Sequence, residues 1–189
     1  PMNIVVFSSD SNVFVRPDTT WERDNEDLYV PEFINTLSWT PVLFARISKP
    51  GRSISSKFAS RYYDGIGYGV LLYPEDLICK GPEGFASACC VDHTSFLTFP
   101  TYPPTRLDGQ DGRFNLSKDG TPLLSYDKGS SRMIESAIEE VSKYCYLRIG
   151  DILAIEIDRM STLCKREDDR CHITGTFGED SILDFKTIF

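Results

Sequence analysis

The hydrophobic residues of this chain are grouped in short runs that predict more strands than helices. Residues 40–48 and 67–73 are apolar at nearly every position, which is typical of strands buried on both faces. Shorter apolar runs, bounded by turn residues, predict further strands. These runs lie at 3–7, 12–17, 28–30, 95–99, 148–157 and 181–189.

Three local patterns predict a hairpin and two helices. Residues 113–127 contain two apolar arms around Asp119–Gly120, a pair that type I′ turns prefer. Apolar residues recur at helical spacing over 130–147, with glutamates on the opposite face. A shorter helix is predicted over 55–63, with one of its leading serines as the cap.

Two other segments are expected to form mainly loops. Residues 79–111 are rich in Gly, Pro, Ser and Thr, which predicts loops around the strand at 95–99, and the charged run 165–170 predicts a solvated loop. Because strands outnumber helices and do not alternate strictly with them, the pattern favours an α+β fold over a doubly wound sheet. No repeat or linker divides the chain, so one domain over 1–189 is expected.

The charge balance narrows the classes of partner. The 189 residues include 20 basic and 28 acidic side chains, for a net charge of −8. This balance argues against nucleic acid and against an anionic membrane as partners, because both are held by cation–phosphate contacts. The sequence has no run of about 18 apolar residues that could span a bilayer, and it shows no secretory leader. We therefore expect a cytoplasmic protein.

The cysteines and histidines match no standard disulfide, catalytic or zinc-binding motif. Six cysteines in a chain of this length favour reduced thiols over a disulfide framework, and the adjacent Cys89 and Cys90 are expected to be buried thiols. His93 and His172 are the chain's two histidines, and no G-x-S-x-G elbow accompanies them. Their spacing to the cysteines fits no standard zinc pattern, so a structural role is favoured.

Several stretches, taken in order, resemble one known family, the fumarylacetoacetate hydrolase family. They are VFVRPDTTW, LYVPEF, VLFARISKPGRSISSKFASRYYDGIGYGV, RFNLSKDGTPLLSYD, MIESAIEEVSKYCYLRIGDILAIEI and ILDFK. The resemblance spans the chain from about residue 12 to its end. It implies an α+β domain built on a rolled mixed β-sheet with a few short helices, often found as a dimer.

The resemblance also implies where a metal site would lie. Family members use Mg²⁺ or Mn²⁺, which needs several carboxylate oxygens and polarises an oxo-acid substrate. The family's ligands are two glutamates in E-x-E spacing and an aspartate on the following strand. In this chain, those positions fall on Thr40, Val42 and Leu71. We therefore expect no metal cofactor, with packing in place of the ligands.

Other functional positions of the family also differ here. The catalytic lysine aligns with Glu83, and the catalytic threonine falls near Ile157. The loop that carries a histidine in the family is reduced to SSDSN at 8–12. Together these differences predict a diverged, non-catalytic relative, so the resemblance favours a protein that is not an enzyme.

Such a relative could bind a small carboxylate ligand in the former cleft, lined by Arg16, Thr40 and Glu83. Arg16 takes the place of a lysine in the family's F-x-K-P segment and could attract the ligand. The alternative interpretation, a solvated or salt-bridged Arg16, is favoured because most arginines lie on the surface. We expect a homodimer.

Two other hypotheses stay open. The chain could be a metal-dependent hydrolase, isomerase or decarboxylase that acts on a diketo-acid or oxo-acid through a rebuilt site, with Asp18, Glu32, Asp76 and Glu156 as candidate carboxylates. It could instead be a degenerate protomer that pairs with an active paralogue, using some of its aromatic residues as interface anchors.

Overall fold

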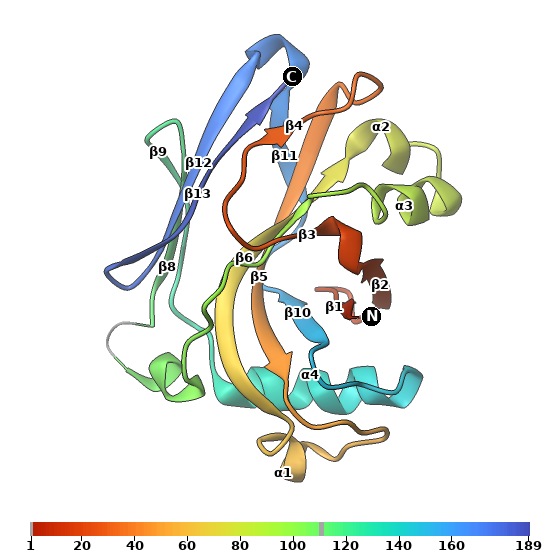
Figure 1. The fold of residues 1–189 in the computed structure, drawn as a ribbon, viewed down its shortest axis with the longest axis vertical. Coiled ribbons are helices and arrows are strands. Elements are labelled where there is room, and N and C mark those ends of the chain that lie inside the picture. Colours follow the sequence, from red (N-terminus) through yellow and green to blue (C-terminus); the bar gives the residue numbers. More distant parts are fainter. Residues whose placement is uncertain (1, 110–111) are drawn as a thin grey trace.

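The computed structural model describes residues 2–109 and 112–189, which form two β-sheets and a few short helices (Figure 1). The larger sheet has the strand order β2 (Val13–Pro17), β1 (Asn3–Phe7), β10 (Ile152–Glu156), β5 (Thr36–Ile47), β6 (Tyr63–Pro74), β7 (Ser95–Phe96), β3 (Trp21–Glu22), and β11 (Ser161–Lys165) also pairs with β5. The smaller sheet has the order β4 (Leu28–Tyr29), β13 (Asp180–Ile188), β12 (Arg170–Phe177), β8 (Phe114–Lys118), β9 (Thr121–Tyr126). Both sheets mix parallel and antiparallel pairs, as the predicted α+β class requires.

The long antiparallel strands β5 and β6 form the centre of the molecule and curve through its whole height (Figure 1). Their side chains alternate between two separate cores. Leu43 and Ala45 belong to the larger core, whereas Val42 and Phe44 belong to the smaller one. The prediction that these strands are buried on both faces is therefore confirmed.

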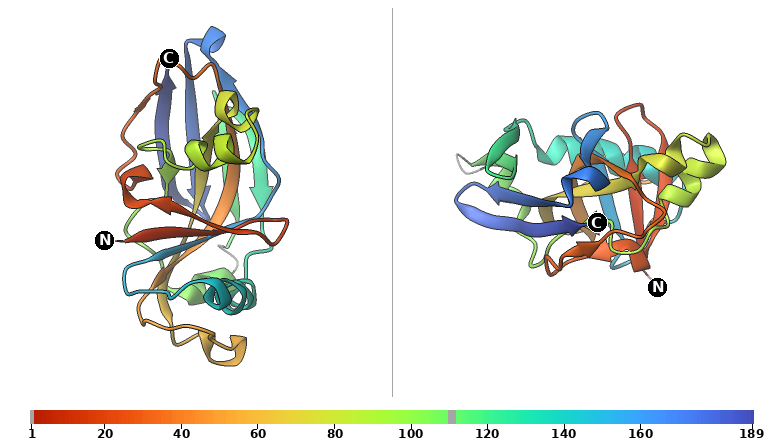
Figure 2. Two further views of the ribbon diagram at one scale, coloured as in Figure 1. Left: turned by 90° about the vertical axis from the view of Figure 1, so that its right-hand side faces the viewer. Right: turned by 90° about the horizontal axis from the view of Figure 1, so that it is seen from above.

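The larger core lies between the central strands and the smaller sheet. Aromatic pairs join the two sheets: the rings of Phe96 and Phe185 are stacked with centroids 3.6 Å apart, and those of Tyr68 and Phe114 at 4.8 Å. Helix α4 (Ser131–Tyr144) closes one end of this core with its apolar face and lies beside α1 (Ser56–Ala59) (Figure 2).

The local patterns with a defined chemistry are confirmed. Ser130 caps α4, because its hydroxyl accepts a hydrogen bond from the Met133 backbone N–H. Asp119 and Gly120 both adopt positive φ, 50° and 78°, as a type I′ turn between β8 and β9 requires. Helix α1 forms where predicted but is a single turn, and the Ser55 side chain at its N-terminus makes no cap bond.

The prediction of loops around one strand over 79–111 is wrong in part. Helix α3 (Pro82–Ala88) follows α2 (Glu75–Ile78), and it begins at Pro82 directly after Gly81, whose φ is +92°. Gly84 lets α3 approach the backbone of Leu77 in α2 closely, because a Cβ there would collide with the carbonyl. Strand β7 keeps two of the five residues expected over 95–99.

Three short 3₁₀-helices also connect the strands: η1 (Asp18–Thr20), η2 (Pro104–Asp108) and η3 (Arg166–Asp168). The last lies within the charged run 165–170, which forms the expected connection between β11 and β12. All six cysteines are free thiols. Cys89 is buried as expected, but Cys90 is exposed at the end of α3, so that half of the expectation is wrong. Across the two described ranges, every helix is too short or too polar to cross a bilayer.

Candidate functional site

The three positions that the family resemblance assigns to metal ligands are packed in the smaller core. Thr40, Val42 and Leu71 have exposed fractions of 1%, 0% and 0%. Thr40 on β5 lies directly opposite Leu71 on β6, and Val42 follows two residues along the same face of β5. The three side chains offer one hydroxyl and no carboxylate. This donor set does not fit Mg²⁺ or Mn²⁺, which need several oxygen ligands.

Arg16 reaches the same core from β2 and is fully buried. Its Nη2 donates hydrogen bonds to the Leu72 carbonyl, at 3.0 Å, and to the Thr94 hydroxyl. The guanidinium lies 4.6 Å from the centre of the Tyr73 ring, where cation–π attraction favours it. The interpretation of Arg16 as a solvated or salt-bridged arginine is therefore wrong: no described acidic side chain forms an ion pair with it.

Several buried polar atoms in this core lack a hydrogen-bond partner among the described residues. They are Nε and Nη1 of Arg16, the Thr40 hydroxyl and the Tyr73 hydroxyl. An unsatisfied buried polar group costs about 1–3 kcal/mol, so natural proteins seldom leave several in one place without water or a ligand. The cluster therefore has spare donors for an acceptor group.

Burial raises the pKa of the titratable groups around Arg16. Burial raises the pKa of the Tyr73 phenol to about 12 and that of the Cys89 thiol to about 11, although Arg16 lowers both. Burial also raises the pKa of Glu156, which ends β10 opposite Val42. The Ser9 backbone N–H donates to the Glu156 carboxylate at 3.0 Å. Tyr73 and Cys89 are therefore neutral at pH 7, and neither offers Arg16 an anionic partner.

Aromatic side chains separate this core from an adjacent cleft. The Phe85 ring, on α3, stacks on Tyr73 with centroids 5.9 Å apart and meets Phe14 edge-on at 5.1 Å. Phe14, Phe85 and Glu156 also line a cleft of about 660 Å³ on the outer side. Phe14 and Phe85 therefore stand between solvent in that cleft and the buried guanidinium.

The structure places the remaining predicted residues apart from this core. Glu83 is exposed in the first turn of α3, and Phe85, two residues further on, contacts the cluster instead. Ile157 follows β10 and packs against the larger core. The residues expected to line the cleft are thus brought together only in part: Arg16 and Thr40 lie on the face of the smaller core, and Glu83 does not.

The four carboxylates of the rebuilt-site hypothesis are also not gathered. Asp18 and Glu32 are exposed, and Asp76 accepts hydrogen bonds from the backbone of Asn35 and from that of the following residue at the start of β5. Within residues 2–109 and 112–189, no group of three or more His, Cys, Asp or Glu side chains is placed to hold a metal ion.

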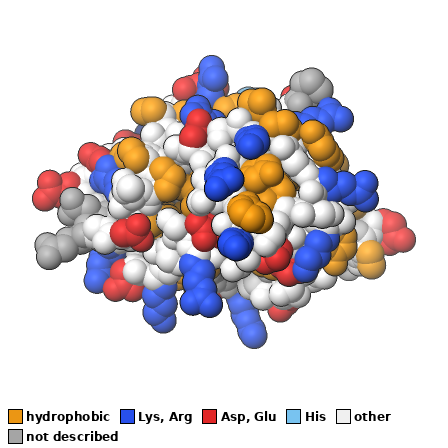
Figure 3. All heavy atoms as spheres, turned by 90° about the horizontal axis from the view of Figure 1, so that it is seen from below, with side chains coloured by type: hydrophobic (Ala, Val, Ile, Leu, Met, Phe, Trp, Pro, Cys, Tyr) orange, Lys and Arg blue, Asp and Glu red, His pale blue; other side chains and the backbone are white. Residues whose placement is uncertain are grey.

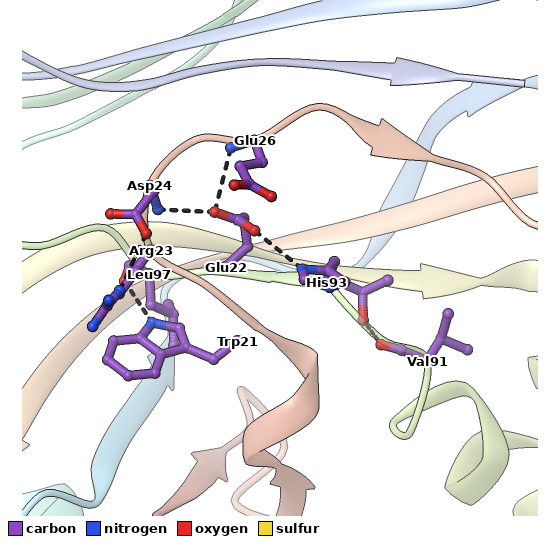
Figure 4. Close-up of polar contacts among 9 residues, drawn as sticks. Trp21, Glu22, Arg23, Asp24, Glu26, Val91, His93 and Leu97 are labelled. Carbon is purple, nitrogen blue, oxygen red and sulfur yellow. Dashed lines mark hydrogen bonds and ion pairs between the residues drawn. The ribbon is translucent and has the colours of Figure 1, made fainter.

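A second polar site, missed by the sequence analysis, joins β3 to the loop before β7 (Figure 4). The Glu22 carboxylate is 5% exposed and lies 3.1 Å from Nδ1 of the half-exposed His93. Its other oxygen accepts the backbone N–H groups of Asp24 and Glu26, at 2.8 and 3.3 Å. Glu22 and His93 are 71 residues apart, so no local spacing could have indicated the pair.

His93 of this pair borders an open groove of about 790 Å³ next to β4. Its lining combines aromatic, acidic and thiol side chains, including Tyr29, Phe33, Asp92 and Cys90. His172, the other histidine, lies on β12 and contacts Asp184 at 2.6 Å. The two histidines and their neighbouring cysteines therefore belong to separate parts of the fold.

Comparison with known proteins identifies the fold. A scan against protein-family models gives no match, and a search of the curated proteins gives none either. Solved structures match the whole architecture. Fumarylpyruvate hydrolase from Pseudomonas aeruginosa, in complex with Mn²⁺ and pyruvate, superimposes with a TM-score of 0.80 at 15% identity, covering 100% of this chain and 91% of that one.

Another match is 2-hydroxyhepta-2,4-diene-1,7-dioate isomerase from Mycobacterium marinum, with a TM-score of 0.78, 15% identity, and coverage of 98% of this chain and 74% of the other. A Yersinia pestis structure described as belonging to the fumarylacetoacetate hydrolase family superimposes with a TM-score of 0.78 at 17% identity. The match covers 100% of this chain and 93% of that one. The chain has the α+β fold of this family. The resemblance inferred from the sequence is thus confirmed at the level of the fold.

Proposed function

We propose that this chain is a diverged, non-catalytic protein with the fumarylacetoacetate hydrolase fold, which lacks the family's divalent-metal site and acts by binding. The observation that carries the proposal is the burial of Thr40 opposite Leu71, with Val42 beside them. Clustered carboxylates without a cation repel one another, and apolar replacements relieve that repulsion and add burial. A former ligand set converted to packing would have this composition.

The ligand that fits this core best is a small carboxylate. A buried guanidinium without an acidic partner favours an anion, and its unpaired Nε and Nη1 form two donors of the fork that carboxylates accept. The hydroxyls of Thr40 and Tyr73 are further donors without partners. Entry would require the rings of Phe14 and Phe85 to move aside, since they separate Arg16 from the cleft.

Thermal unfolding in EDTA tests the proposal. Pyruvate is the first ligand to try, because one structure with this fold holds it, with acetate and oxalate beside it. A carboxylate that binds only the folded state raises the melting temperature. We expect at least one of the three to do so at millimolar concentration, and replacing EDTA with Mn²⁺ to add nothing.

Variants separate this site from the surface. Arg16→Met should abolish the carboxylate effect, and Tyr73→Phe and Thr40→Val, which keep the packing, should weaken it. Lys80→Met, on the exposed link between α2 and α3, is the matched control and should change nothing. The ligand assignment fails if no carboxylate stabilises the wild type. The non-catalytic assignment fails if purified protein turns over an acylpyruvate or oxaloacetate when Mn²⁺ is supplied.

The assembly and the compartment stay proposals as well. We propose a cytoplasmic homodimer, consistent with six free thiols and with the dimers common in this family. Sedimentation velocity of the purified chain measures whether it is a dimer. Co-purification with an active paralogue from the native host would instead favour the degenerate-protomer hypothesis.

A further inference from the structure

Two segments of this acidic protein carry basic side chains and no acidic ones, although Asp64, Glu139 and Glu140 border the surface that they form. Residues 45–62 and 143–149 contain seven of the 20 basic residues of the chain and none of its 28 acidic residues. The rest of the chain therefore carries 13 basic and 28 acidic residues. Such segregation of charge in a protein of net charge −8 creates a local positive field that the overall balance hides.

The two segments lie side by side at the end of the molecule formed by α1 and α4 (Figure 2). Gly51 and Leu147 exchange two backbone hydrogen bonds, at 3.0 and 2.9 Å. The Ser53 backbone N–H donates to the carbonyl of Ser142 at 2.9 Å. The basic side chains of both segments therefore belong to one continuous surface.

Most of these cations are free of acidic partners. Arg46 pairs with Asp64 at 2.9 Å, and Lys143 pairs with Glu140 at 2.6 Å. The other five form no ion pair with any described residue and are exposed; they are Lys49, Arg52, Lys57, Arg61 and Arg148.

Figure 3 shows exposed apolar side chains beside basic ones on this side of the molecule, with acidic side chains also present. Phe58 is 46% exposed, Tyr144 71%, Tyr146 54% and Ile149 68%. The charged ends of Lys57 and Arg61 lie 5.6 and 5.5 Å from the Phe58 ring centre, so cation and ring are presented together. Exposed aromatic side chains beside arginine are typical of contact surfaces rather than of inert ones.

We propose that this basic–aromatic face, formed by residues 45–62 and 143–149, binds an acidic protein segment that carries apolar anchor residues. Carboxylates of the partner would pair with the five free cations, and its apolar side chains would cover Phe58, Tyr144 and Ile149. Nucleic acid and anionic membranes are less favoured, because their extended negative charge would also meet the acidic remainder of the molecule. A short segment can stay within the face.

The test uses the full chain and defined probes. A fluorescent 16-residue peptide of alternating Glu and Leu/Trp residues is compared with the same peptide carrying Lys for Glu, by fluorescence anisotropy. We expect saturable binding of the acidic peptide below about 1 mM that weakens with salt, and at least tenfold weaker binding of the lysine peptide.

Charge reversal locates the site. The double variant Lys57→Glu/Arg61→Glu should weaken binding of the acidic peptide at least tenfold, and Phe58→Ser should weaken it severalfold. The matched control Lys80→Glu/Lys128→Glu reverses two exposed lysines outside both segments and should stay within twofold of the wild type. All variants have surface substitutions, and unchanged melting temperatures verify their folding.

Several results would overturn the proposal. They are no binding of the acidic peptide at 1 mM, equal binding of the lysine peptide, or equal weakening by the control pair. Tighter binding of a 20-nucleotide single strand or of vesicles with 30% phosphatidylserine would assign the face to phosphates instead. Self-association that Lys57→Glu/Arg61→Glu removes would assign it to a second copy of the chain. These outcomes are independent of the carboxylate site at Arg16.

Discussion

Thr40 on β5 lies directly opposite Leu71 on β6, and both side chains are buried. The family resemblance implied carboxylate ligands for a metal ion at these positions of the two strands. Here, a hydroxyl faces a branched alkyl chain in a core that continues through Val42 and Phe44. The pair thus defines what has to be tested: whether this place in the sheet is packing or a binding site for a cation.

Introducing one carboxylate at this place should be costly. Leu71→Asp would bury a charge without a counterion and leave a cavity, so we expect the free energy of unfolding to fall by about 3–5 kcal/mol in urea titrations. Leu71→Met keeps volume and apolarity and should cost less than about 1.5 kcal/mol. A loss below 1 kcal/mol for Leu71→Asp would mean that the position is not close-packed core.

The Tyr73 hydroxyl provides a second test, because it is buried without a partner. Tyr73→Phe removes an unsatisfied group and keeps the ring that stacks between Arg16 and Phe85. We expect the ligand-free protein to keep its stability or to gain up to about 1 kcal/mol. A loss of 2 kcal/mol or more in chemical unfolding would show that the hydroxyl is satisfied, for instance by ordered water.

Glu156 should give the protein a pH dependence of definite sign. Burial raises the pKa of its carboxyl in the folded state above the ordinary value of 4.5, so folding favours the protonated form. The stability that this provides is complete below pH 4.5 and is lost as the pH rises through the folded-state pKa. Glu156→Gln stays neutral and can still accept from Ser9.

The difference in free energy of unfolding between Glu156→Gln and wild type should therefore grow in favour of the variant as the pH rises from 4 to 7. Urea titrations at four or five pH values measure it. A difference that stays constant over this range would contradict a buried Glu156 carboxyl with a raised pKa.

Asp76 should give the stability a pH dependence of the opposite sign to that of Glu156. Burial alone would raise the pKa of this carboxyl, but hydrogen bonds from the Asn35 side chain and from the backbone N–H groups of Asn35 and Thr36 lower it overall. Its contribution is present above the ordinary value of 3.8 and is lost as the pH falls through the lower folded-state pKa.

Asp76→Asn should cost about 1–2 kcal/mol at pH 7, because the carboxylate secures the first residue of β5. The cost should shrink below pH 4, where the wild type loses the same charge. Thermal unfolding between pH 2.5 and 7 measures both. An equal cost at every pH would show that the charge of the Asp76 carboxylate does not stabilise the fold.

The sequence predicts the parts of this fold that rest on local chemistry. β5 and β6 are apolar on both faces, α4 has an apolar stripe and a serine cap, and Asp119–Gly120 fits the turn it forms. Helix α3 was not predicted, since seven residues that include Pro82, Gly84 and Ser87 resemble a loop. β12 was missed because polar residues alternate with its buried positions.

The surroundings of Arg16 and the pairing of Glu22 with His93 could not be predicted from the sequence. In β2, Val15 is 46% exposed while Arg16 is fully buried, the reverse of what side-chain polarity suggests. Only the packing of β2 against Tyr73 and Leu72 fixes that orientation. The pairing of Glu22 with His93 likewise depends on two segments that meet only in the folded chain.

The most direct test for a metal site at Thr40, Val42 and Leu71 is a Mn²⁺ titration followed by the electron paramagnetic resonance signal of the free ion. P. aeruginosa fumarylpyruvate hydrolase, whose structure holds Mn²⁺, is the positive control. We expect the wild type to leave the free Mn²⁺ signal undiminished up to millimolar concentration, while the control binds the ion. Saturable uptake of one equivalent of Mn²⁺ by the wild type would contradict this expectation.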